Sequence, residues 1–427
     1  MDTPVTPSPS VFRHRDFALF WWSRVLANLA AAAESVTIGW TVYAVARQNH
    51  ISVEQGALLV GMVGLVQFVP VFCLTLFAGE TADRYDRRKL MMLCVGAEIV
   101  CVLALGTLAL HPSPSLAPIF IAAAVFGAAR AFLSPASSAM GPMLVPREEL
   151  PRAVAWSSLA WQGAAIFGPS AAGLLISISP AVAFFTAGGL YSLSVVALWL
   201  IKGNTQPVVQ AGSRFALMRE GLAYVWTNKI VLGAISLDLF AVLLGGATAL
   251  LPIFARDILH TGPWGLGLLR AAPAVGALLM SIWLSRNTLE RRVGPIMFAS
   301  VAGFGVSTLV FAVSTSLWLS IGALFALGAF DMVSMVIRGA LVQLETPDDM
   351  RGRVSAVNAI FINTSNQLGE FESGILAAAL GAVNATLIGG IGTLVVVGLW
   401  MWWFPSLRRR QGLVSDPEPV EGASGTI

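Results

Sequence analysis

Long apolar runs, separated by short polar breaks, dominate the chain. A run of about 20 apolar residues spans the hydrocarbon core of a bilayer as a helix, and we count twelve runs of that kind. They lie near residues 17–46, 54–78, 90–110, 116–141, 153–178, 181–201, 230–255, 265–285, 295–314, 317–342, 354–380 and 385–404. The pattern predicts an all-α membrane protein with twelve transmembrane helices.

Composition excludes a water-soluble globule. Hydrophobic residues make up 56% of the chain and charged residues 11%, whereas soluble domains carry about 25% charged residues. The three cysteines, Cys73, Cys94 and Cys101, lie within apolar runs, so neither a disulfide framework nor a metal centre is indicated. We expect no cofactor, no metal and no nucleic-acid partner. The first 17 residues have no apolar core of signal-peptide type, so the first run should remain as a membrane span.

The positions of Lys and Arg predict the orientation. Short loops rich in these residues stay cytoplasmic. With the N-terminus inside, 20 of the 26 basic residues fall on the cytoplasmic side, Arg47 and Arg256 fall outside, and the other four lie within spans. We therefore expect a multi-pass membrane protein with both termini in the cytoplasm.

The longest interior break, residues 202–229, divides the chain. Phe215, Met218, Leu222 and Val225 recur in it at helical spacing, which predicts an amphipathic helix on the inner membrane surface. A plain flexible linker is the alternative. The predicted organisation is a six-helix bundle over residues 1–201, this linker, a second six-helix bundle over 230–405, and a disordered cytoplasmic tail over 406–427.

The two halves resemble each other in sequence. A shift of 201 residues superposes Gly127 on Gly328, Pro146 on Pro347, Arg152 on Arg353, Gly168 on Gly369 and Gly173 on Gly374. A similar shift places residues 64–70, GLVQFVP, on residues 267–273, GLLRAAP. Two six-helix repeats joined by a cytoplasmic linker are typical of one large class of secondary transporters, whose substrate site lies at the midplane between the halves.

The stretch GETADRYDRRKL, after the second apolar run, carries the most specific motif: Gly79, Asp83, Arg84, Arg87 and Arg88. It resembles the loop signature of the major facilitator superfamily, and its ADRYDRR form is similar to the branch that contains enterobactin exporters and predicted transmembrane secretion effectors. Thr81 and Asp86 depart from the usual Leu and Gly of the signature.

The resemblance implies that this loop gates the cytoplasmic side. Asp83 would latch onto the start of the eleventh span, where unpaired N–H groups and the helix dipole favour negative charge. The arginines of the loop would pair with acids such as Asp348 and Asp349. The alternative is that the loop only supplies positive charge on the inside.

Gly168, Pro169 and Gly173 in the fifth run fit the pattern G-P-x-x-x-G, which resembles the signature of the superfamily's antiporters. That resemblance implies an exporter. Ordinary close packing of small residues in a bent helix explains the same pattern.

Ionisable residues within spans mark pathways or proton relays by default. The resemblance implies that spans one, four, seven and ten line the cavity, and these spans carry Glu34, Arg130, Asp238 and Asp331. In the eleventh span we favour Glu370 over Glu372 because its polar stripe is longer. Carboxylates beside a cavity can exchange protons as desolvation and a neighbouring Arg change their affinity for the proton. Static ion pairs, Arg130 with an acid or Arg24 with Glu98, are the alternative.

Together with these residues, the resemblance implies a monomeric secondary transporter of the bacterial inner membrane that exports a small amphiphilic molecule, siderophore or drug-like, by alternating access in exchange for protons. An uptake permease of the same fold and a non-transporting membrane sensor are the alternatives. An enzyme is not expected, because the loops are too short to hold a hydrolytic domain. The chain also lacks the nucleotide-binding motif G-x-x-x-x-G-K-[ST], which argues against ATP-driven pumping by this chain alone.

Overall fold

The computed structural model describes residues 11–111, 115–203, 205–206, 214–287, 291–347 and 350–412. Within these residues the chain is helical and contains no strand. The long helices of the N-terminal half are α1 (Arg15–Gln48), α2 (Val53–Arg84), α3 (Arg87–Leu108), α4 (Ala117–Met140), α5 (Leu150–Ile178) and α6 (Pro180–Trp199). Short 3₁₀ turns are η1 (Val11–Arg13), η2 (Gly141–Leu144) and η3 (Arg147–Glu149).

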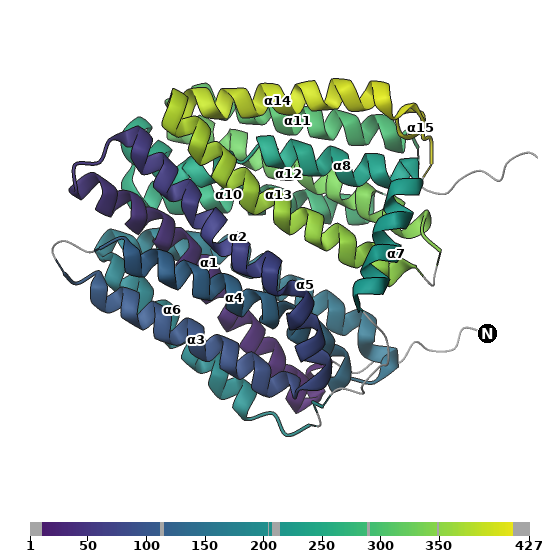
Figure 1. Cartoon of the computed structure of the whole chain (residues 1–427), viewed down its shortest axis with the longest axis horizontal. Coiled ribbons are helices and arrows are strands. Elements are labelled where there is room, and N and C mark those ends of the chain that lie inside the picture. Colours follow the sequence, from purple (N-terminus) through teal and green to yellow (C-terminus); the bar gives the residue numbers. More distant parts are fainter. Residues whose placement is uncertain are drawn as a thin grey trace, which may run out of the picture.

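The C-terminal half repeats this plan. Its long helices are α8 (Lys229–Leu244), α10 (Gly262–Arg286), α11 (Val293–Val313), α12 (Leu317–Leu344), α13 (Arg351–Leu380) and α14 (Ala382–Trp403). The shorter elements are η4 (Ala247–Leu250), α9 (Leu251–Ile253), η5 (Phe254–Ile258) and α15 (Pro405–Arg408), and α7 (Arg214–Thr227) lies between the halves. Figure 1 shows the two halves as separate helical bundles, one above the other.

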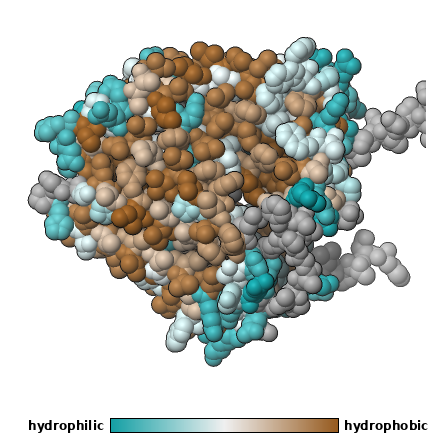
Figure 2. Space-filling view, viewed as in Figure 1, coloured by the Kyte–Doolittle hydropathy of each residue, from teal (hydrophilic) through white to brown (hydrophobic). Residues whose placement is uncertain are grey.

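Eleven helices in the described part of the chain are long and apolar enough to cross a membrane. The predicted run at 354–380 is helical as α13, a helix of 30 residues, but α13 is not among the eleven. Its charged and amide side chains, such as Arg353, Gln367 and Glu370, lower its hydropathy. The predicted count of twelve is therefore not reached by composition, although the multi-pass helical fold is confirmed. Figure 2 shows an apolar band between hydrophilic ends.

Polar side chains set the starts of several helices. The Asp86 carboxylate accepts hydrogen bonds from the backbone N–H groups of Arg88 and Lys89 and caps α3. Ser179 caps α6, and Asn228 caps α8. Such caps satisfy N–H groups that have no partner within the helix. The breaks between apolar runs therefore end one helix and begin the next.

Glycines at matched positions of the two halves explain the internal repeat. A Cβ atom on Gly127 of α4 would lie 2.3 Å from the carbonyl oxygen of Gln67 on α2. A Cβ atom on Gly328 of α12 would lie 2.0 Å from the carbonyl oxygen of Pro273 on α10. Only glycine permits these approaches. The same helix contact is thus built twice, once in each half.

The halves share one hydrophobic core at the end of the molecule opposite α7, which we call the far end. There Tyr43 and Val60 of the N-terminal half lie in one buried cluster with Leu250, Phe254 and Phe311 of the C-terminal half. At the other end, which carries α7 and α15 and which we call the linker end, each half has its own cluster. The halves are therefore joined at the far end.

The linker helix α7 packs on the C-terminal half, at the right of Figure 1. Val225 is buried in a cluster with Val231 and Val354. A Cβ atom on Gly221 would lie 2.8 Å from the carbonyl oxygen of Arg353, and Arg353 Nη1 lies 2.7 Å from Glu220 Oε2. The helix expected in this linker thus docks on the end of α13.

The predicted tail begins with ordered structure, contrary to the expectation for residues 406–412. α15 covers Pro405–Arg408, Leu407 is buried, and the Arg410 guanidinium pairs with Glu345. This packing holds the chain against α11 and α12. Residues 413–427 lie outside the described residues.

Candidate functional site

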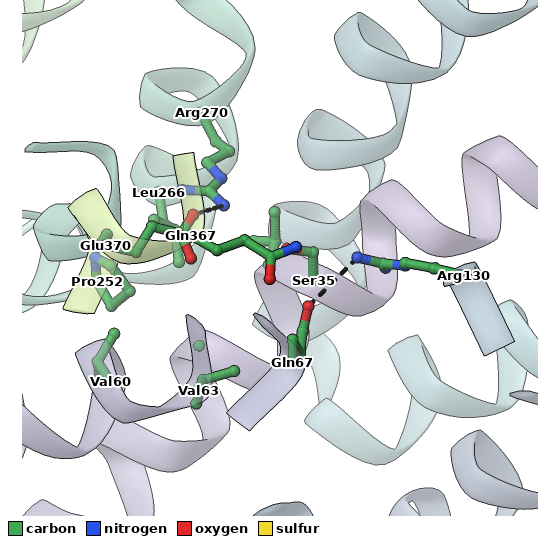
Figure 3. A pocket seen from close by; sticks show the side chains of 13 residues that line it. Ser35, Val60, Val63, Gln67, Arg130, Pro252, Leu266, Arg270, Gln367 and Glu370 are labelled. Atoms are coloured by element: carbon green, nitrogen blue, oxygen red, sulfur yellow. Dashed lines mark hydrogen bonds and ion pairs between the residues drawn. The ribbon is translucent and has the colours of Figure 1, made fainter. Parts of the chain in front are cut away.

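A cavity of about 160 Å³ lies between the two halves. Its walls come from α1, α2 and α4 on one side and from η4, α9, α10 and α13 on the other. It is lined by Ser35, Val36, Gly39, Val60, Val63, Gln67, Arg130, Ala249, Pro252, Leu266, Arg270, Gln367 and Glu370. Figure 3 shows that polar side chains from both halves point into it. We call it the central cavity.

Arg130 on α4 forms the charged wall of the N-terminal half. Its Nη1 donates to Gln67 Oε1 at 3.3 Å, and its Nη2 lies 3.6 Å from Glu34 Oε1 (Figure 3 shows the Gln67 contact). Glu34 is fully buried behind Arg130, and its Oε2 accepts a 2.7 Å hydrogen bond from the hydroxyl of Tyr191. Of the two predicted residues, Arg130 lines the central cavity, and Glu34 contacts Arg130 from the buried side.

Arg270 on α10 forms the charged wall of the C-terminal half. Its Nη1 donates to the carbonyl oxygen of Thr248 at 2.7 Å, and its Nη2 lies 3.9 Å from Glu370 Oε1 (Figure 3). A separation of 3.9 Å is an ion pair without a close hydrogen bond. The Glu370 carboxylate can therefore exchange this partner for another without losing a short bond.

Asp238 and Asp331 lie away from the central cavity. Asp238 on α8 is buried and forms an ion pair with Arg338 on α12, which is also buried. Both acids line a second, small cavity of about 10 Å³ within the C-terminal half, together with Ser334. The shift of 201 residues aligned Arg130 with Asp331, but the acid that pairs with Arg130 is Glu34.

The G-P-x-x-x-G motif on α5 contacts one helix of its own half and one helix of the other half. A Cβ atom on Gly168 would lie 2.5 Å from the Cβ of Ala32 on α1. A Cβ atom on Gly173 would lie 2.8 Å from the Cα of Gly267 on α10, and the Pro169 carbonyl oxygen also faces Gly267. Close packing explains the glycines, and the packed partner of Gly173 is the other half of the molecule.

The loop motif lies at the linker end. Arg84 pairs with Glu80, and Arg87 Nη2 lies 3.9 Å from Asp83 Oδ1. The Arg88 guanidinium donates to the carbonyl oxygen of Ile201. These contacts lie within the N-terminal half, and Gly79 is buried beside them. The expected partners Asp348 and Asp349 lie outside the described residues, so the latch stays a prediction.

Asp86, which departs from the signature, has a structural role. Its Oδ1 accepts a 2.7 Å hydrogen bond from the Thr205 hydroxyl in addition to the two backbone bonds that cap α3. Partial burial raises the pKa of Asp86, but the bonds from Thr205, Lys89 and Arg88 outweigh this effect, and the pKa lies below its usual value of 3.8. The carboxylate thus ties the chain after α6 to the start of α3.

Sequence reasoning did not assign Gln67, Arg270, Gln367, Tyr191 or Glu98 to the site. A signal existed for two of them, because the alignment of residues 64–70 with 267–273 pairs Gln67 with Arg270. Both line the central cavity. Tyr191 gives no such signal, since a tyrosine in an apolar run is interpreted as a core residue unless its hydrogen bond to Glu34 is known.

Comparisons with known proteins agree with this architecture. A family model described as "Transmembrane secretion effector" matches residues 6–416. The enterobactin exporter EntS of Citrobacter koseri is 25% identical over 372 residues, which cover 86% of this chain and 87% of that protein. EntS of Salmonella typhi is 26% identical over 352 residues, covering 82% and 83%.

Solved structures show the same fold. A POT family transporter in complex with 5-aminolevulinic acid superposes with a TM-score of 0.73 at 12% identity, covering 92% of this chain and 96% of its own. The inward open conformation of the xylose transporter XylE from E. coli gives 0.69 at 13% identity, covering 95% and 98%. The family match spans nearly the whole chain, so the chain belongs to the transmembrane secretion effector family of the major facilitator superfamily and is a multi-pass secondary transporter of small molecules, not an enzyme.

Proposed function

We propose that this transporter exports a small amphiphilic molecule of the siderophore class through the central cavity, by alternating access and in exchange for protons. The observation that carries the proposal is the placement of Arg130 and Arg270, from opposite halves, on the walls of one cavity that also holds Glu370. A molecule bound there contacts both halves, so that their relative movement changes its access to water.

The polar groups of the cavity suit an oxygen-rich ligand. The two guanidinium groups and the amides of Gln67 and Gln367 offer N–H donors, whereas the Glu370 carboxylate accepts. Apolar wall residues such as Val60, Val63 and Leu266 fit the apolar part of an amphiphile. A hydroxyl of the ligand can donate to the Glu370 carboxylate, whose ion pair with Arg270 is long, at 3.9 Å.

One comparison supports export, and one structural feature is compatible with it. The similar proteins named above are exporters of enterobactin, a siderophore. The halves share a core at the far end, and each half has its own core at the linker end. With the linker end in the cytoplasm, this arrangement fits a state in which an exporter binds its substrate from inside the cell.

Transport into inside-out vesicles tests the proposal. Vesicles containing the protein, with an acidic interior, should accumulate a catecholate siderophore from a chemically diverse panel, and empty vesicles should not. Arg270→Gln should reduce the initial rate by about tenfold or more, because a charge-assisted hydrogen bond contributes about 1.5–3 kcal/mol. The matched control is Arg286→Gln at the end of the same helix. Accumulation only in right-side-out vesicles would show uptake instead.

A further inference from the structure

A buried acidic cluster lies behind the wall of the central cavity. Glu34 on α1 is fully buried, and Glu98 on α3 is 1% exposed. The charge of Glu98 interacts with those of Glu34 and Arg130. Tyr191 on α6 donates its hydroxyl hydrogen to Glu34. Four helices of the N-terminal half thus bring two carboxylates, one guanidinium and one phenol together, and neither carboxylate lines the central cavity.

The charges of this cluster do not balance. Among the described residues, Arg130 is the one cation whose charge acts on both carboxylates. The other titratable groups that face the pair are Tyr191 and, on α3 itself, Cys94 and Cys101. An unpaired charge within a membrane protein is costly. Two carboxylates beside one guanidinium are therefore neutral only when they hold one proton between them.

In the described part of the chain, the two carboxylates also have too few hydrogen-bond donors. Glu98 Oε2 is buried and has no hydrogen-bond partner among the described residues, and the same holds for Glu34 Oε1. Glu34 Oε1 has only the 3.6 Å ion pair with Arg130. Buried polar atoms normally have a partner. A proton on this pair would supply a donor where the described structure supplies none.

Arg130 connects the cluster with the substrate. It is the one member that also lines the central cavity, where its Nη1 donates to Gln67. When both carboxylates are charged, they attract Arg130 away from the cavity, against the attraction of Glu370 on α13. When the pair holds a proton, that attraction is weaker. The position of Arg130 therefore depends on whether the pair holds a proton. The binding of a substrate that contacts Arg130 then depends on that proton as well.

We propose that Glu34 and Glu98 together form the site of the exchanged proton, separate from the central cavity, with Arg130 as the positioning residue that links the two sites. The proton enters from water on one side of the membrane, is held as an O–H bond on one carboxylate, and leaves to water on the other side. The identity of the exchange partner rests on the proposed function, but the proton site itself does not.

Two assays on one set of vesicles separate the roles. Glu98→Gln should lower transport driven by a pH gradient by about tenfold or more, a typical size for a coupling between sites. Substrate counterflow, in which labelled and unlabelled substrate exchange without net proton movement, should keep the wild-type rate. Glu372→Gln, an acid on α13 outside the cluster, is the matched control and should leave both rates unchanged. Gradient-driven transport by Glu98→Gln at the wild-type rate would overturn the proposal.

A second variant decides the case in which Glu98→Gln does not reach the membrane. Tyr191→Phe keeps the ring and removes the donor to Glu34. The pH midpoint of gradient-driven transport should rise, since the charged carboxylate loses a hydrogen bond, and an unmoved midpoint would overturn the proposal. If the wild type transports nothing in either assay, the proposed function is wrong. If the wild type transports normally and both variants behave like it, only the proposed proton site is wrong.

Discussion

Gly61 on α2 and Gly374 on α13 touch backbone to backbone across the two halves: a Cβ atom on Gly61 would lie 2.7 Å from the Cα of Gly374. The second crossing, between Gly173 on α5 and Gly267 on α10, has the same form. Both crossings lie toward the far end, where the halves share their core. Small residues allow helices within a membrane to pack this closely. The two glycine pairs therefore help to hold the halves together at the far end.

Gly61→Leu should open the far end. The added side chain cannot fit against the α13 backbone, and overpacking of this kind costs about 1–3 kcal/mol. In a Cys73→Ser background, a cysteine placed at Ser35 in the cavity should react faster with an impermeant thiol reagent added from the outside. Transport should fall as well. Gly96→Leu is the control, because a Cβ atom there has nothing within 4 Å; equal labelling of the two variants would contradict the role of the crossing.

Tyr43→Phe should weaken the same closure without adding bulk. The Tyr43 hydroxyl donates to the Asp257 carboxylate of the other half, and the Arg256 guanidinium lies 5.9 Å from the ring centroid. A hydrogen bond to a charged group contributes about 1.5–3 kcal/mol, so outside labelling of the Ser35→Cys reporter should rise about tenfold or more. An Asp257→Asn variant should have a similar effect. Labelling unchanged in both would show that this contact does not close the far end.

Asp83→Asn should slow transport while leaving insertion intact, because an amide binds the positive end of a helix dipole less well than a carboxylate. The initial transport rate, normalised to the amount of protein in the membrane, measures the effect. Glu80→Gln serves as the control, since Glu80 pairs with Arg84 of its own helix. An unchanged rate for Asp83→Asn would remove the latch from the account.

Asp86→Ala should lower the free energy of unfolding of the detergent-solubilised protein by about 1 kcal/mol, the usual effect of losing a helix N-cap. The folded-state pKa of Asp86 lies below the usual 3.8. Its contribution is therefore full above the unfolded value and is lost as the pH falls through the lower, folded value. The wild type and Asp86→Ala should converge in melting temperature at strongly acidic pH. Thr205→Val, which removes one of the three bonds, should show a smaller loss at neutral pH.

The fold could be predicted from the sequence because membrane spans depend on composition along one helix at a time. The exception, α13, shows the limit of this rule. Its polar stripe lowers its hydropathy, yet Gln367 and Glu370 face the central cavity and not lipid. Matched glycines also predicted the repeat, since Gly127 and Gly328 each fix a crossing within one half.

The site could be predicted only in part, because a cavity depends on how several helices face one another. Arg130 and Glu370 were expected, and both line the central cavity. Asp238 satisfied the same rule of a charge within a span, but its buried partner Arg338 was visible only in the structure. Glu98 was named only in a static ion pair with Arg24, because the sequence of one helix does not show that α3 brings Glu98 near Glu34.

Simultaneous measurement of proton and substrate movement tests the central claim most directly. When a transported siderophore is added to inside-out vesicles with an acidic interior, wild-type protein should release protons as substrate enters. Glu98→Gln should lose this linked movement, whereas Glu372→Gln, an acid on α13 outside the acidic cluster, should keep it. Substrate entry without proton release in the wild type would contradict proton exchange.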